Sequence, residues 1–153
     1  MTRQEQIDIE YMRQALLLAK QASSAGEVPV GALVVHNDVV IGTGFNQTIA
    51  GCDPSSHAEV IALRNAAQSI ANHRLSQSTL YVTLEPCLMC CGCLQHARVD
   101  RLVFGAREPR TGAVVSVNET LADPNALHRI AVTEGVLAME CTQLLQQFFQ
   151  DRR

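Results

Sequence analysis

The chain has 153 residues, of which 47% are hydrophobic and 18% charged, and its net charge is −3 at pH 7. This composition excludes a disordered chain, gives no electrostatic sign of a nucleic-acid binder, and suits one globular domain whose core needs no disulfide bonds. No apolar run is long enough to cross a bilayer, and the polar N-terminal residues do not resemble a signal peptide. We therefore expect a single domain over residues 1–153 that lies in the cytoplasm and not in a membrane.

Hydrophobic periodicity and turn residues predict alternating helices and strands after an initial hairpin. Gly26 and Pro29 end the first helix, and Pro86 is suited to the first position of the third. In chain order, the expected elements are a helix at 4–24, strands at 30–35 and 39–44, a helix at 57–70, a strand at 80–84, a helix at 87–97, a strand at 102–105, a short helix at 119–128, a strand at 130–132 and a final helix from about 137.

This order indicates an α/β protein with three layers, in which a central mixed sheet of five strands has helices on both faces. The second and third helices each begin directly after a loop or the end of a strand. Because ligands in α/β sheets gather where helix N-termini meet, residues at these two helix starts are candidates for a site.

Four of the six cysteines lie within seven residues, at positions 87, 90, 91 and 93. Without a secretion signal, such a cluster favours metal binding over disulfide bonds. Cys87 and Cys90 are three residues apart and share one helix face, where the positive helix N-terminus favours the metal-binding thiolate. His57, at the start of another helix, offers a third ligand. Three nitrogen or sulfur ligands leave one corner of a tetrahedral zinc open, which is typical of catalytic sites.

The spacing also leaves other interpretations open. Cys91 and Cys93 lie within one helical turn of the other two cysteines, and Cys93 as a fourth ligand would make a closed structural site. Glu59 follows Ser56 by three residues and could belong to a capping box. His57 itself could be a surface histidine near a helix cap. The juxtaposition of all these residues favours the metal site over each separate alternative.

The pattern His-x-Glu at 57–59 followed by Pro-Cys-x-x-Cys at 86–90 is the signature of zinc-dependent nucleobase deaminases. Zinc lowers the pKa of a water molecule from 15.7 to about 7. Glu59 would take the proton of that water and deliver protons to the ring nitrogen and the departing amine, which is general acid–base catalysis. We predict Glu59 as the catalytic residue and His57, Cys87 and Cys90 as ligands of one Zn²⁺ per subunit.

Beyond this motif, the sequence resembles the bacterial tRNA-specific adenosine deaminases almost from end to end. The zinc motif is common to the deaminase superfamily, whereas the string at 80–87 and the C-terminal tail are particular to the tRNA enzymes. The matching segments are Glu-Val-Pro-Val-Gly-Ala at 27–32, Gly-Phe-Asn at 44–46, Asp-Pro-Ser-Ser-His-Ala-Glu at 53–59, Leu-Tyr-Val-Thr-Leu-Glu-Pro-Cys at 80–87, Val-Phe-Gly-Ala-Arg at 103–107, Thr-Glu-Gly-Val-Leu at 133–137, and Phe-Phe at 148–149 before Arg-Arg at 152–153.

The resemblance implies a cytidine-deaminase-like fold, a homodimer that holds a tRNA anticodon loop, and conversion of the wobble adenosine to inosine. It implies that Asn46 bonds the target base, although an asparagine is also an ordinary loop residue. Glu108, Phe149, Arg152 and Arg153 fall where the family contacts RNA, although the three C-terminal residues also suit an ordinary tail at a helix end. A splayed single-stranded loop suits such a site, because the target base leaves the stack at low cost.

The chain departs from the family pattern at a few positions. Glu108 and Arg110 stand where aspartate and lysine are common, and Thr48 stands where proline is frequent. Cys91 and Cys93 replace residues that are usually small, which leaves the number of metal ligands open.

Two rival functions remain from the sequence. One is a zinc deaminase of a free base or nucleotide, such as guanine, cytidine or deoxycytidylate. The other is a structural zinc module that binds RNA or protein without chemistry, and this rival requires the closed site.

Overall fold

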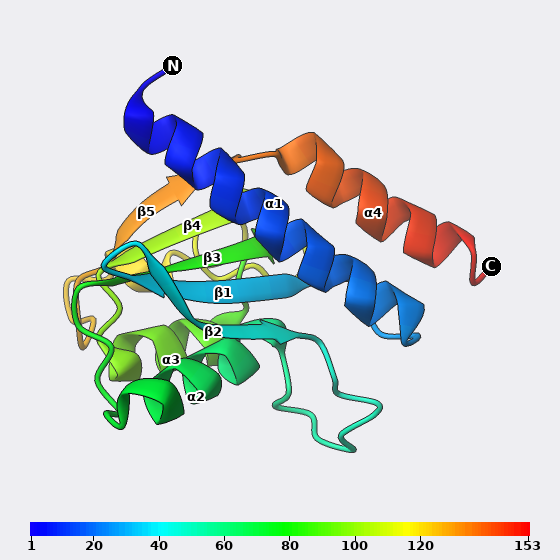
Figure 1. The fold of residues 1–153 in the computed structure, drawn as a ribbon. Coiled ribbons are helices and arrows are strands. Elements are labelled where there is room, and N and C mark those ends of the chain that lie inside the picture. Colours follow the sequence, from blue (N-terminus) through cyan, green and yellow to red (C-terminus); the bar gives the residue numbers. More distant parts are fainter.

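The computed structural model describes all residues, 1–153, as a five-stranded sheet between two layers of helices (Figure 1). The strands are β1 (Gly31–His36), β2 (Val39–Phe45), β3 (Ser78–Leu84), β4 (Arg101–Ala106) and β5 (Ala131–Glu134). The helices are α1 (Arg3–Ser24), α2 (Ala58–Ile70), α3 (Leu88–Ala97), α4 (Ala138–Gln150) and the single 3₁₀ turn η1 (Thr120–Ala122). The predicted three-layer α/β architecture is confirmed.

The sheet is mixed, with the strand order β2-β1-β3-β4-β5. The β1–β2 hairpin and the β1–β3 pair are antiparallel, whereas β3, β4 and β5 run parallel. Helix α3 crosses from β3 to β4, as a parallel pair requires. Helices α1 and α4 cover one face, and α2 and α3 cover the other (Figure 1).

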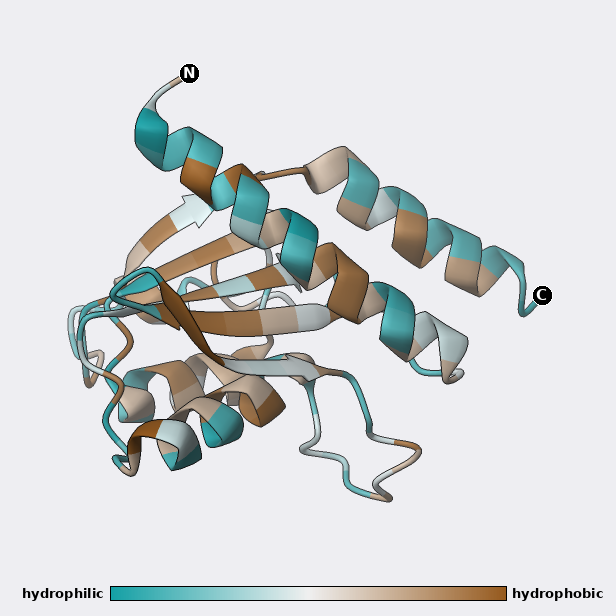
Figure 2. Ribbon diagram, in the orientation of Figure 1, coloured by the Kyte–Doolittle hydropathy of each residue, from teal (hydrophilic) through white to brown (hydrophobic).

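The core follows these layers. Strands β1, β3 and β4 are hydrophobic along most of their length, whereas hydrophilic and hydrophobic residues alternate along α1 and α4 (Figure 2). Leu80, Leu102 and Phe104 are fully buried between the sheet and the α2–α3 layer. None of the helices is both long and apolar enough to span a membrane.

Two glycines let α2 lie directly against β2. A Cβ atom on Gly44 would lie 2.6 Å from the carbonyl oxygen of Ala58, and one on Gly42 would overlap the backbone of Ala66. Any side chain at these positions would push α2 away from the sheet. The close approach fixes the start of α2, where His57 lies.

Two local predictions are wrong. Residues 119–128 form only the η1 turn, because the Asp123 carboxylate accepts from the Asn125 N–H at 2.8 Å and Pro124 follows, which favours a local turn over a helix. Pro86 precedes α3 instead of beginning it, since Cys87 has extended dihedral angles and occupies the N-cap position.

Candidate metal centre and substrate site

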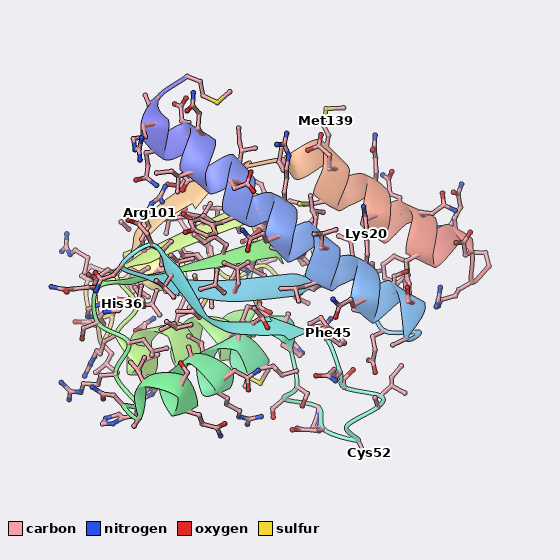
Figure 3. The ribbon with its side chains drawn as sticks, viewed as in Figure 1. Lys20, His36, Phe45, Cys52, Arg101 and Met139 are labelled. Atoms are coloured by element: carbon pink, nitrogen blue, oxygen red, sulfur yellow. The ribbon has the colours of Figure 1, made fainter.

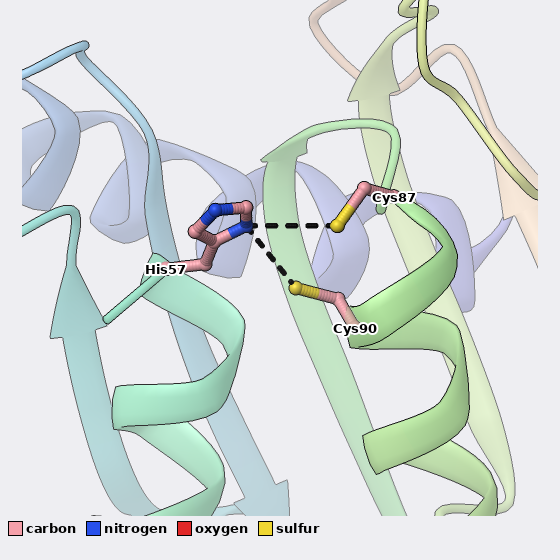
Figure 4. A group of neighbouring side chains, drawn as sticks. All are labelled: His57, Cys87 and Cys90. Atoms are coloured by element: carbon pink, nitrogen blue, oxygen red, sulfur yellow. Dashed lines mark hydrogen bonds between the residues drawn. The ribbon is translucent and has the colours of Figure 1, made fainter. Parts of the chain in front are cut away.

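The three predicted ligands come together between the N-termini of α2 and α3. His57 is the N-cap residue of α2 and Cys87 that of α3, with Cys90 one turn further along. The Nδ1 atom of His57 lies 3.6 Å from the Sγ of Cys87 and 3.5 Å from the Sγ of Cys90 (Figure 4). No other group of three such residues in the chain places its ligand atoms this close together.

These separations fit a tetrahedral zinc ion. Zinc bonds of about 2.3 Å to sulfur and about 2.0–2.1 Å to nitrogen would place a ligand nitrogen about 3.6 Å from each ligand sulfur. The observed distances of 3.6 and 3.5 Å match this edge of the tetrahedron. The donor set of one imidazole and two thiols is also one that zinc prefers. The residues therefore fit the metal that the sequence predicts.

The thiol groups of the site are strongly perturbed. Hydrogen bonds from the Cys90 thiol and from His57 lower the pKa of Cys87 to about 3. The bond donated to Cys87, together with burial, raises the pKa of Cys90. Cys87 is therefore the first thiol to become a thiolate, and a dication opposite both sulfurs would favour loss of the Cys90 proton as well.

The two remaining cysteines of α3 point elsewhere. Cys91 is buried in the core, and its thiol lies 3.9 Å from the Pro86 carbonyl oxygen as a weak donor. Cys93 lines a shallow cavity of about 300 Å³ between α2 and α3, beside Leu63 and Arg64. Neither belongs to the ligand group. The arrangement supports three protein ligands and does not support the closed site with Cys93.

Glu59 lies in the first turn of α2, only two residues after His57, and its side chain is 4% exposed. The capping box is absent, because the Ser56 N–H bonds to the Asp53 carbonyl and the α2 N-cap has no side-chain hydrogen bond. Burial raises the pKa of Glu59 to about 7, and the negative charge of Cys87 acts in the same direction, whereas the charge of His57 acts against it. A carboxyl group of this kind can accept and donate protons near neutral pH.

Asn46 lies at the end of β2, on the loop that leads to α2. Its side-chain oxygen accepts from the backbone N–H of Ala58 at 2.8 Å. This bond satisfies one of the free N–H groups at the α2 N-terminus and ties the loop to the residue after His57. The side-chain amide group of Asn46 makes no hydrogen bond within the chain and remains available to a ligand.

The loop from β2 to α2 is anchored from inside the protein. Glu27 is 1% exposed, and its carboxylate accepts from the N–H groups of Ile49 at 3.1 Å and Ala50 at 2.8 Å. Thr48 donates to the same carboxylate at 3.4 Å. Beyond these anchored residues, Cys52 lies exposed at the tip of the loop (Figure 3).

Three of the predicted RNA-contacting residues, Glu108, Phe149 and Arg153, line one cavity. Glu108 and Phe149 both line a cavity of about 570 Å³ between α4, the segment after β4 and the C-terminal ends of β3 and β4. Arg107, Arg110 and Arg153 lie around it as well. Phe149 is 48% exposed, so an aromatic surface is open to a ligand together with Arg110 and Arg153, whereas Arg107 is paired with Glu134 at 2.8 Å.

Arg152 lies apart from this cavity. Its guanidinium carbon stacks 3.5 Å from the centre of the Phe148 ring, and it donates to the Phe148 carbonyl oxygen at 3.1 Å. The neighbouring Arg153 lines the cavity instead. The structure thus brings Glu108 and Phe149 together but places Arg152 against its own helix.

The sequence reasoning missed the two buried glutamates, Glu27 and Glu85. Glu85 is 2% exposed and accepts five hydrogen bonds from the segment after β4. Both glutamates lie within segments that match the family, at 27–32 and 80–87, but nothing in those segments indicates which backbone groups they bind.

Comparison with known proteins adds a family and several relatives. Residues 5–106 match the family model described as the cytidine and deoxycytidylate deaminase zinc-binding region. The chain is similar to the tRNA-specific adenosine deaminase of Haemophilus influenzae, with 52% identity over 149 residues that cover 97% of this chain and 86% of the relative. It is 38% identical to the tRNA-specific adenosine deaminase of Bacillus subtilis, over 94% of this chain and 89% of that protein.

Solved structures agree with this similarity. A structure from a study of A-to-I editing by tRNA:A34 deaminases at the wobble position superimposes with a TM-score of 0.86 at 37% identity, covering 89% of this chain and 99% of the other. A guanine deaminase from Nitrosomonas europaea superimposes with a TM-score of 0.75 at 28% identity, covering 90% of this chain and 81% of that protein.

Proposed function

The chain belongs to the zinc-binding cytidine and deoxycytidylate deaminase family, and we propose that it converts the wobble adenosine of a tRNA anticodon to inosine. The observation that carries this proposal is a group of three metal ligands with a buried carboxyl group, Glu59, beside it. The similarity of 52% to a tRNA-specific adenosine deaminase, over nearly the whole chain, favours adenosine in tRNA over a free base.

In the proposed reaction, water replaces the amino group of the adenine ring, and inosine and ammonia are the products. Zinc, when held by His57, Cys87 and Cys90, makes water acidic enough to act as a nucleophile near neutral pH. Glu59 takes a proton from the attacking water and passes it to the adjacent ring nitrogen. The same carboxyl group then takes the remaining proton of the hydroxyl group now on the ring carbon and delivers it to the amine, so that the C–N bond breaks, ammonia leaves and the C=O bond of inosine forms. The enclosed position of Glu59 keeps bulk water from competing for these protons.

Substrate binding is proposed for the groups around the metal centre. Asn46 lies where the loop from β2 to α2 begins. Its side-chain N–H₂ group can bond the flipped base, while its side-chain oxygen still accepts from the Ala58 N–H at the start of α2. Glu108 and Phe149, in the arginine-lined cavity, are placed to contact the neighbouring nucleotides, since exposed rings stack on bases and arginines bind phosphates. Arg152 would have to leave Phe148 to join them.

We further propose that residues 1–153 act as one domain, as a homodimer, and in the cytoplasm. A single domain is supported by the sheet, because segments from both halves of the chain contribute strands to it. Support for the dimer comes from Leu88 and Met89, which are 61% and 38% exposed at the start of α3, next to the metal ligands. A cytoplasmic location follows from tRNA as the substrate.

The proposal is tested by incubating the zinc-loaded protein with an anticodon stem-loop that carries adenosine at the wobble position, followed by nucleoside analysis for inosine. Free guanine, cytidine and deoxycytidylate are assayed in parallel at equal concentration. We expect inosine from the stem-loop and slower turnover of every free compound. Faster turnover of a free compound than of the stem-loop would replace this function with that of a free-base or nucleotide deaminase.

A further inference from the structure

The segment that follows β4 has an unusual source of hydrogen bonds. Residues 107–119 form no helix and no strand, so their N–H groups need other acceptors. Four of those groups are satisfied by one side chain. The carboxylate of Glu85 accepts from the N–H of Glu108 at 3.0 Å, Val114 at 3.0 Å, Val115 at 2.8 Å and Ser116 at 3.0 Å, and also from the Ser116 hydroxyl.

The fit between carboxylate and segment is tight. A Cβ atom on Gly112 would overlap the Glu85 carboxyl group, so a larger residue at 112 would push the segment away. Both carboxylate oxygens are used, one for Glu108 and the other for the residues at 114–116. Five donors hold this buried anion, which forms no ion pair within 4.0 Å. Burial raises the pKa of Glu85, but these hydrogen bonds lower it more.

Glu85 also belongs to the turn that carries a metal ligand. It lies two residues before Cys87, and its own N–H bonds to the Ala106 carbonyl at 2.8 Å. The next residue, Pro86, accepts from the Ala113 N–H at 2.9 Å. The segment after β4 is therefore fastened to the Cys87 turn by a side chain and by a backbone group in succession.

This fastening determines where the segment presents its exposed side chains. Glu108, whose N–H bonds to Glu85, lines the cavity with Phe149 on α4. The Glu108 carboxylate in turn accepts from the Arg110 N–H at 3.0 Å. The position of Arg110, which also lines the cavity, therefore depends on that of Glu108. A shift of the segment would thus move the cavity wall relative to the metal centre.

We propose that Glu85 is a positioning residue for RNA binding, which holds Glu108 at a fixed place relative to the metal centre. This inference rests on the proposed function and extends it to a residue that touches neither metal nor substrate. Glu85 acts through the N–H of Glu108, so its effect falls on the binding of the anticodon loop and not on the chemical step.

The test is a double-mutant cycle of Glu85→Gln and Glu108→Ala, in which KM and kcat for the stem-loop are measured on zinc-loaded proteins. Gln keeps the shape of Glu85 but turns an amide N–H₂ group toward backbone donors. We expect Glu85→Gln to raise KM about tenfold, with kcat within about threefold and one zinc per chain retained. In the Glu108→Ala background, the same change should raise KM by less than threefold.

Two further variants keep the test decisive. Gly112→Ala keeps the Glu85 side chain but adds a methyl group that overlaps its carboxyl group, so the segment after β4 must shift. This variant should also raise KM, even if Glu85→Gln does not fold. Glu119→Gln is the matched control, because it makes the same chemical change at an exposed residue of the same segment without a side-chain hydrogen bond. It should leave KM and kcat unchanged.

The outcomes separate this inference from the proposed function. A wild-type protein that forms no inosine from the stem-loop refutes the function and, with it, the role of Glu85. A wild-type protein that is active, with Glu85→Gln and Gly112→Ala each lowering kcat or losing zinc at unchanged KM, refutes only the positioning role. Equal effects of Glu85→Gln with and without Glu108 would refute it too.

Discussion

Replacement of Glu59 by glutamine removes the proposed proton carrier and little else. Glutamine has the same size, the site of Glu59 is 4% exposed, and none of the three metal ligands changes. We therefore expect the variant to fold, to bind one zinc per chain and to bind the stem-loop as the wild type does. The loss should fall on kcat.

The size of that loss follows from the enclosure of Glu59. General acid–base catalysis contributes about 10²- to 10⁴-fold, and this side chain serves both the attack and the departure of the amine. Because Glu59 is buried, bulk water cannot replace it, so we expect a loss of about 10³- to 10⁴-fold, or about 4–5.5 kcal/mol in activation free energy.

The assay is single-turnover formation of inosine at saturating protein, with zinc measured on the same samples. Glu10→Gln, an exposed change on α1 at the other face of the sheet, is the control and should retain full activity (Figure 1). If Glu59→Gln keeps more than a tenth of the wild-type rate, Glu59 does not carry the protons.

Other consequences of the structure can be measured separately. Cys93→Ala should retain one zinc per chain, because Cys93 lies outside the ligand group, and loss of zinc on dialysis would place it among the ligands. Affinity for the stem-loop should fall as salt rises, since phosphate contacts release counterions, and an affinity independent of salt would argue against RNA as the substrate. Asp8→Asn should lower the free energy of unfolding by about 3 kcal/mol at pH 7, because it breaks the pair that the nearly buried Asp8 forms with Arg101 at 2.6 Å. Burial raises the pKa of Asp8, but bonds from Arg101 and Tyr81 lower it more, to below 3.8. Its stabilising effect is therefore full above about pH 4 and is lost as the pH falls through the folded-state pKa. The difference between wild type and Asp8→Asn in urea unfolding should accordingly be smaller at pH 3 than at pH 7, and an equal difference at both would refute this role of the ion pair.

The grouping of His57, Cys87 and Cys90 could be predicted because two of them are neighbours in the sequence and the third begins a helix. Cys87 and Cys90 are one turn apart, and His57 begins the preceding helix, so the helix starts alone bring them to one place. Most helices and strands also follow the predicted ranges within one or two residues. The exception at 119–128 arose where the Asp123 side chain and Pro124 favour a turn, although the flanking apolar residues suggest a helix.

The anchoring role of Glu85 could not be predicted from side-chain patterns. Its partners are backbone N–H groups 23 to 31 residues away, and such groups leave no trace in the choice of residues. The stacking of Arg152 on Phe148 could not be predicted from the sequence either. Neighbouring arginines at a helix end are equivalent in the sequence, and only the turn of the helix decides that Arg153 lines the cavity.

X-ray absorption at the zinc edge of the loaded protein tests the three-ligand centre most directly. We expect two sulfur neighbours at about 2.3 Å, one imidazole nitrogen, and a fourth position taken by an oxygen from solvent. Three or four sulfur neighbours would contradict it, because a site closed by protein ligands leaves no place for the attacking water.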